Sequence, residues 1–113
     1  MNKRLLVLIW ILILIILPAV SQVAAAQAGA PIVLLLTAEG PINPSMLGYL
    51  ERGISSASQQ NAEALILMLD TPGGSVDLMN EFVQVIRNSS TPVIVYVAPQ
   101  GAIAGSAGTV ITL

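Results

Sequence analysis

The chain lacks histidine and cysteine altogether, and its only lysine is Lys3, near the N-terminus. Without those residues neither a Ser-His-Asp nor a Cys-His catalytic arrangement can be built. Because cysteine is absent, a disulfide framework is excluded as well. A nucleophilic serine in this chain would therefore need a base from outside the 113 residues. Lysine is the usual substitute for histidine, since an ε-amine desolvated in an apolar site can lose its proton near neutral pH.

Charge is also scarce, at 9% of the residues, with a formal net charge of −2. After residue 28 the only basic side chains are those of Arg52 and Arg87. This part of the chain has no basic patch to hold phosphates, so we expect no nucleic-acid partner. Neither the dinucleotide fingerprint G-x-G-x-x-G nor the Gly-Lys-Ser/Thr of the phosphate loop occurs, which argues against nucleotides.

Residues 1–28 have the features of a targeting segment. A short basic region at residues 2–4 precedes an apolar run over residues 5–17, and small residues beyond Pro18 permit cleavage after Ala26 or Ala28. The apolar stretch is shorter than the ~20 residues that span a bilayer comfortably. We predict a signal peptide, with a retained N-terminal membrane anchor as the alternative. Either segment places the remainder of the chain on the extracytoplasmic side of the membrane.

Three β–α units are predicted after residue 28. Short apolar runs without alternation indicate strands that are covered on both faces. Asn43, followed by Pro44, and Ser75 are residues that favour helix N-termini. The predicted strands cover residues 32–36, 64–69 and 92–97, and the predicted helices cover residues 44–60, 76–88 and 106 onward. This alternation predicts an α/β fold with a parallel sheet and right-handed crossovers.

Two glycine-rich segments follow predicted strands: residues 70–75 (Asp-Thr-Pro-Gly-Gly-Ser) and residues 101–108 (Gly-Ala-Ile-Ala-Gly-Ser-Ala-Gly). In a parallel sheet, ligands and reacting groups gather at the carboxyl ends of the strands. A glycine turn before a helix presents bare backbone N–H groups, which suit a developing oxyanion. Ser106, surrounded by small residues, is a candidate nucleophile. Together the segments predict acyl-transfer chemistry at adjacent strand ends.

Each segment alone also has a purely structural interpretation. The first is compatible with a tight strand-to-helix turn in which Ser75 caps the helix. The second can let a helix pack closely on the sheet, and its Gly-Ser-Ala-Gly sequence is not the G-x-S-x-G elbow of the α/β-hydrolases. The coincidence of both segments at strand ends, rather than either one alone, indicates a site.

With both segments in this order behind an export signal, residues 32–113 resemble the ClpP/crotonase superfamily. The resemblance rests on Asp-Thr-Pro-Gly-Gly at residues 70–74 and Ala-Gly-Ser-Ala-Gly-Thr at residues 104–109. It points to the membrane-bound branch, the NfeD-type serine proteases encoded beside stomatin-like proteins, and signal peptide peptidase A is similar through the same features. It implies that residues 29–113 are the N-terminal part of a ClpP/crotonase-like protease domain, truncated here. The family typically continues into transmembrane helices and a small β-barrel domain.

The resemblance also implies roles for individual residues. Ser106 corresponds to the catalytic serine, and the backbone N–H of Ala107 and that of Gly73 or Gly74 correspond to the oxyanion hole. The general base of the family is a lysine from a later segment, expected here beyond Leu113. The implied activity is that of a Ser/Lys-dyad endopeptidase that cleaves apolar peptide segments and needs no metal or cofactor. The implied partners are a peptide or protein substrate, the membrane, a stomatin-like protein and further copies of the chain.

Two other functions remain open at this point. One is a non-catalytic ClpP-like membrane scaffold that binds stomatin-like partners. The other is a crotonase-type acyl-CoA enzyme, which uses a similar backbone oxyanion hole on a thioester. The export signal counts against the acyl-CoA enzyme, because CoA substrates are largely cytoplasmic. A lysine about one βα unit beyond Ser106 would favour the protease over the scaffold.

Overall fold

The computed structural model describes residues 3–4, 7, 10, 12 and 30–113. The chain forms two units, Met1–Ala30 and Pro31–Leu113, and all strands and helices named below belong to the second. The predicted signal peptide or anchor, residues 1–28, falls largely outside the described residues and stays a prediction. Within the described part of the chain, no helix has both the length and the apolar character that crossing a bilayer requires.

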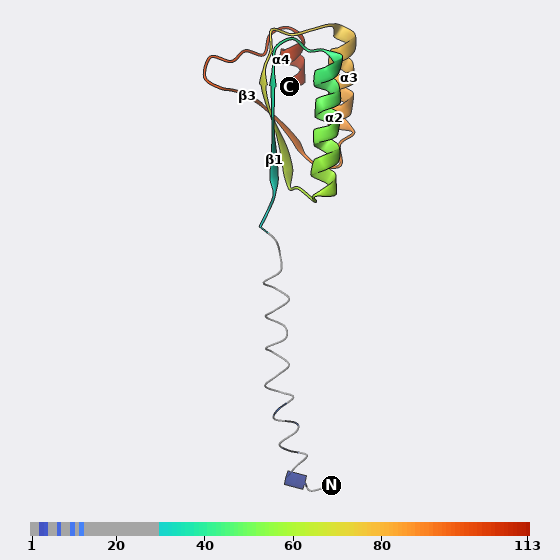
Figure 1. The fold of residues 1–113 in the computed structure, drawn as a ribbon, viewed down its shortest axis with the longest axis vertical. Helices are drawn as coiled ribbons and strands as arrows, with labels where there is room; N and C mark the ends of the chain where they lie inside the picture. Colours follow the sequence, from blue (N-terminus) through green and yellow to red (C-terminus); the bar gives the residue numbers. More distant parts are fainter. Residues whose placement is uncertain (1–2, 5–6, 8–9, 11, 13–29) are drawn as a thin grey trace. The chain divides into compact units, whose positions relative to one another are not determined.

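The second unit is an α/β structure in which strands and helices alternate (Figure 1). Its elements are β1 (Val33–Glu39), α2 (Pro44–Gln59), β2 (Ala64–Asp70), α3 (Val76–Arg87), β3 (Val93–Val97) and α4 (Ala107–Ile111). The three strands form one sheet in the order β1-β2-β3, and both neighbouring pairs are parallel. The predicted α/β class with a parallel sheet is thereby confirmed for the described residues.

The two long helices begin where the sequence predicts. Asn43 Oδ1 accepts the Met46 N–H at 2.9 Å, and Pro44 is the first residue of α2. Ser75 Oγ accepts the Leu78 N–H at 3.3 Å, directly before α3. Each side chain satisfies one of the backbone donors that a helix N-terminus leaves without a partner. Local sequence therefore indicates where α2 and α3 begin.

The hydrophobic core lies between the sheet and the helices that cover one of its faces, α2 and α3 (Figure 1). The largest fully buried apolar side chains come from β2, α2 and α3: Leu50, Leu65, Leu67, Leu69 and Phe82. A Cβ at Gly53 would overlap the side chain of Leu36. Glycine at this position lets α2 approach β1 closely.

The prediction that the strands are covered on both faces is wrong for β1 and β3. Leu35, Ile94 and Tyr96 are 58%, 51% and 58% exposed, and the register places Leu35, Ile66 and Ile94 in one row across the sheet. Residues of β1 that face α2, such as Leu36, are buried. An unbroken apolar run shows that both faces of a strand are apolar. Whether a second layer covers them depends on elements elsewhere, and none of the described residues supplies that layer.

Candidate active site

The two glycine-rich segments lie side by side beyond the carboxyl ends of β2 and β3. The Thr71 N–H donates to Ile103 O at 2.7 Å, and the Gly105 N–H donates to Thr71 O at 2.9 Å. These bonds form a parallel bridge between Thr71 and Ala104. The prediction that the segments meet at adjacent strand ends is confirmed by this pairing.

The first segment is also held from its other side. The Ile42 N–H donates to Gly73 O, and the Gly40 N–H donates to Asp70 O, both at 2.9 Å. Residues 70–74 therefore run between the end of β1 on one side and residues 103–105 on the other. Such pairing on both sides leaves this stretch little freedom to move.

Gly73 lies directly against the turn that carries Ser106. A Cβ at Gly73 would be 2.7 Å from Gly105 O, 2.9 Å from Ser106 Cβ and 3.2 Å from Ala107 N. Gly73 also has φ of +112°, a value that L side chains rarely adopt. Only glycine fits here, and its missing side chain lets the turn at residues 105–107 pack directly against it.

Ser106 has an unusual backbone conformation, with φ of 50° and ψ of −115°, directly before α4. A non-glycine residue in a sparsely populated region costs about 1–3 kcal/mol and persists only where its surroundings impose it. The side chain of Ser106 is exposed and makes no capping hydrogen bond. Although the G-x-S-x-G motif is absent, the chain makes the same kind of sharp, strained turn into a helix that exposes the nucleophile of α/β-hydrolases.

The backbone donors around Ser106 differ in their hydrogen bonding. The Gly73 N–H donates to Thr71 Oγ1 at 3.0 Å in a buried position. The N–H groups of Gly74 and Ala107 donate to no other group of the described residues. Gly73 O accepts from Ile42, and a trans peptide points its N–H opposite to its C=O. The Gly74 N–H therefore points away from Ile42, toward the side on which residues 103–105 lie.

Sequence reasoning did not single out Asp70 and Thr71 as residues that shape the site. Asp70 Oδ1 accepts a hydrogen bond from the Ile103 N–H at 3.0 Å. Thr71 is fully buried, and its hydroxyl oxygen accepts a hydrogen bond from the Gly73 N–H. A threonine two residues before a glycine is a known turn pattern, since its hydroxyl can bond the backbone two residues on. That pattern was readable in the sequence. The contact between Asp70 and Ile103 was not, because the two residues are 33 positions apart.

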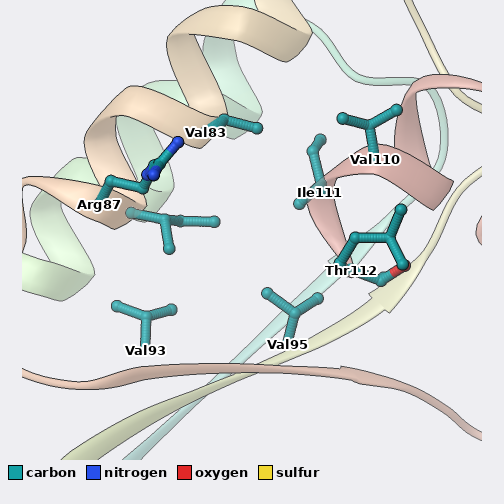
Figure 2. A pocket seen from close by; sticks show the side chains of 9 residues that line it. Val83, Arg87, Val93, Val95, Val110, Ile111 and Thr112 are labelled. Carbon is teal, nitrogen blue, oxygen red and sulfur yellow. The ribbon is translucent and has the colours of Figure 1, made fainter.

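A separate apolar groove of about 580 Å³ lies between α3, β3 and α4. Side chains of Val83, Val93, Val95 and Ile111 surround it, with Arg87 at one side (Figure 2). Neither Ser106 nor the glycines of the first segment line this groove. Among the described residues, no group of three or more acidic, histidine or cysteine side chains is arranged to hold a metal ion.

Pro31–Leu113 is thus an α/β unit in which Ser106 and the backbone N–H groups of Gly74 and Ala107 lie on two neighbouring turns at the ends of parallel strands. Residues 32–113 match the family described as NfeD1b, N-terminal domain, and the chain belongs to this family. The chain is 49% identical over 82 residues to the membrane-bound protease PH1510 of Pyrococcus horikoshii. That match covers 73% of this chain and 19% of the relative.

Solved structures of similar proteins agree with this assignment. One is a serine-to-alanine mutant of the 1510-N membrane-bound stomatin-specific protease, with 45% identity and a TM-score of 0.72. Another is a lysine-to-alanine mutant of that protease in complex with a substrate peptide, with 46% identity and a TM-score of 0.72. Each match covers 74% of this chain, but 41% and 38% of the respective solved chains. The chain therefore spans about a fifth of the curated relative and about two fifths of the solved chains.

Proposed function

We propose that this protein is a membrane-associated serine endopeptidase in which Ser106 is the nucleophile. The observation that carries the proposal is the position of Ser106. This residue lies on a strained turn directly against Gly73, and its hydroxyl makes no helix-capping hydrogen bond. A nucleophile needs a hydroxyl that is not already committed to a structural hydrogen bond, and a path by which a carbonyl can approach it. The exposed side chain and the small residues on both sides supply these conditions.

The oxyanion formed by attack on a peptide carbonyl would be held by the N–H groups of Gly74 and Ala107. Both are without a partner among the described residues, whereas the Gly73 N–H is engaged by Thr71. In this assignment Gly73 contributes the close approach of the two turns rather than a donor. A well-aligned backbone donor contributes about 3–4 kcal/mol to stabilising such a transition state.

The general base is proposed to be a lysine outside residues 30–113, since that part of the chain contains neither lysine nor histidine. Its neutral amine would take the Ser106 hydroxyl proton as the oxygen attacks the carbonyl carbon, and the protonated amine would then pass the proton to the leaving nitrogen. Water would release the acyl group from Ser106. The similar proteins whose structures are solved include variants in which a serine and a lysine are replaced by alanine, which supports this pair of residue types.

The proposed substrate is an apolar peptide segment of a membrane protein, and the candidate for that membrane protein is a stomatin-like protein. The similar solved protein is described as stomatin-specific and has been captured with a substrate peptide. In this chain, Val76 directly follows the first glycine-rich segment and Ile103 lies within the second; both are apolar, 66% and 55% exposed. With residues 1–28 as export signal or anchor, the site would face the extracytoplasmic side. The open apolar face of the sheet is compatible with the proposed assembly of several copies.

The test is peptide cleavage by the protein at its natural length. We expect it to cleave an unstructured apolar peptide and to leave a charged peptide of equal length intact. The 113-residue chain alone should cleave neither, because it has no histidine and its only lysine, Lys3, lies in the predicted signal segment. Serine-dependent cleavage by the 113-residue chain would contradict the proposed lysine. Peptide binding without cleavage by the natural-length protein would favour the scaffold, and hydrolysis of an acyl-CoA thioester would favour the crotonase-type enzyme.

A further inference from the structure

We propose that Thr71 is a positioning residue for the reaction proposed above. Its hydroxyl orients the turn at residues 71–74 so that the Gly74 N–H faces the reacting carbonyl. The inference rests on the proposed function of Ser106 but concerns a different residue. Thr71 is the only fully buried polar residue among those described, which is unusual for a residue within a loop.

The hydroxyl of Thr71 controls one end of the turn. Thr71 Oγ1 accepts the Gly73 N–H at 3.0 Å, and on the far side of the same glycine Gly73 O accepts the Ile42 N–H at 2.9 Å. With its two flanking peptide groups held in this way, Gly73 keeps its φ of +112° although glycine is free to adopt many other conformations. The direction of the Gly74 N–H follows from that conformation, because the peptide between the two glycines is planar.

The rest of Thr71 contacts the segment that carries Ser106. Its backbone N–H and C=O bond Ile103 and Gly105 at 2.7 and 2.9 Å. Its methyl group lies against the first turn of α4, where a Cβ at Gly108 would be 2.6 Å from Thr71 Cγ2. One residue therefore sets both the donor turn and the nucleophile turn. A shift of either part relative to the other would misalign the oxyanion donors.

The effects of the hydroxyl and of the methyl group of Thr71 can be measured separately by substitution. Thr71→Val keeps the shape and the methyl contact but removes the acceptor of the Gly73 N–H. Thr71→Ser keeps the acceptor and removes the methyl group. Thr91→Val is the matched control, since Thr91 is a buried threonine, 5% exposed, in the connection that enters β3 from α3 at the opposite end of the sheet.

The experiment measures kcat and KM for an apolar peptide with the protein at its natural length. We expect Thr71→Val to lower kcat about 100-fold, as for loss of one oxyanion donor, with KM nearly unchanged. Thr71→Ser should keep kcat within about threefold of the natural protein, because the hydroxyl still orients the turn. Thr91→Val should leave both constants unchanged. A purely structural role of Thr71 would instead lower the amount of active enzyme in the serine and valine variants alike.

Two results would overturn the positioning role while leaving the proposed function intact: an unchanged kcat in Thr71→Val, or equal losses in Thr71→Val and Thr71→Ser. If Thr71→Val does not fold, Thr71→Cys takes its place in the experiment. The cysteine variant differs from Thr71→Ser only in having sulfur in place of oxygen, and sulfur is a weak hydrogen-bond acceptor. A kcat in Thr71→Cys equal to that of Thr71→Ser would then overturn the role. Full cleavage by Ser106→Ala would overturn the proposed function itself, and the positioning role with it.

Discussion

Ser75 and Ser106 each stand directly before a helix and beyond the carboxyl end of a parallel strand, yet they use their hydroxyls differently. Ser75 has φ of −70° and ψ of 153°, and its Oγ accepts the Leu78 N–H. Ser106 has φ of 50° and ψ of −115°, and its side chain makes no capping bond. The extended conformation of Ser75 is the one in which a serine caps a helix. The conformation of Ser106, with positive φ and negative ψ, leaves its hydroxyl without a capping hydrogen bond.

Backbone conformation therefore decides which serine has a hydroxyl available for chemistry. Small residues precede both serines, so composition does not distinguish them. The two serines differ in what the glycine beside them contacts: Ser106 Cβ lies close to Gly73 and the preceding Gly105 pairs with Thr71, whereas Gly74, before Ser75, lies against Ile42. The contacts with Gly73 and Thr71 hold Ser106 in a conformation that an isolated peptide would rarely adopt.

The largest effect is expected when the two serines are exchanged for alanine in turn. Ser106→Ala should reduce peptide cleavage by the natural-length protein to background, because the attacking oxygen is removed. Ser75→Ala should retain most activity and lower the free energy of unfolding by about 1 kcal/mol, the usual cost of a lost N-cap. Cleavage rates and urea unfolding measure the two effects. Loss of turnover in Ser75→Ala with retention in Ser106→Ala would reverse the assignment.

A second pair of variants tests whether close approach, rather than glycine conformation, makes the Ser106 turn special. Gly40 and Gly73 both have positive φ, +94° and +112°, but a Cβ at Gly40 would meet nothing within 4 Å. Gly40→Ala should therefore cost only the backbone strain, about 1–2 kcal/mol. Gly73→Ala should cost about 1–3 kcal/mol more, because its methyl group would overlap Gly105 O and Ser106 Cβ, and it should abolish cleavage.

Urea unfolding of both alanine variants, together with cleavage rates, checks this prediction. Gly101→Ala provides a further control, since Gly101 has φ of +93° and also faces open space. Equal losses of stability at Gly40 and Gly73, with activity retained in both, would show that the close approach at Gly73 has no role in the site.

The smallest effect is expected at Asp70, which supports the Ser106 turn through its hydrogen bond to the Ile103 N–H at 3.0 Å. Asp70→Ala should lower the free energy of unfolding by about 1 kcal/mol, the typical contribution of one hydrogen bond. Asp70→Asn keeps an acceptor oxygen and should lose less than about half of that. Unfolding in urea measures both. A larger loss in the asparagine variant than in the alanine variant would contradict a role as hydrogen-bond acceptor.

Much of the fold was predictable because its signals are local. Asn43 with Pro44, and Ser75, identified the starts of two helices, and apolar runs identified three strands. The strand ends were less accurate, since β1 continues to Glu39, beyond the predicted end at residue 36. Pairing with β2 extends the strand through residues that are not strongly apolar, and pairing between distant segments is not visible in a local pattern.

The candidate site was predictable in part. The order of the two glycine-rich segments behind predicted strands indicated that they meet, and the Thr71 to Ala104 bridge confirms that they do. The sequence did not show whether the N–H of Gly73 or that of Gly74 is without a hydrogen-bond acceptor. The answer depends on the hydrogen bond from Gly73 to Thr71 and on the contact with Ile42, which lies 31 positions earlier in the chain than Gly73.

The alternation of strands and helices, the caps of α2 and α3 and the absence of histidine are all evident from the amino-acid sequence, because they depend on residues close together in the chain or on composition. The open face of the sheet and the strained conformation of Ser106 against Gly73 become visible only in the folded chain. Both features arise from contacts between residues far apart in sequence. Such contacts impose backbone conformations and leave surfaces open in ways that local preferences do not specify.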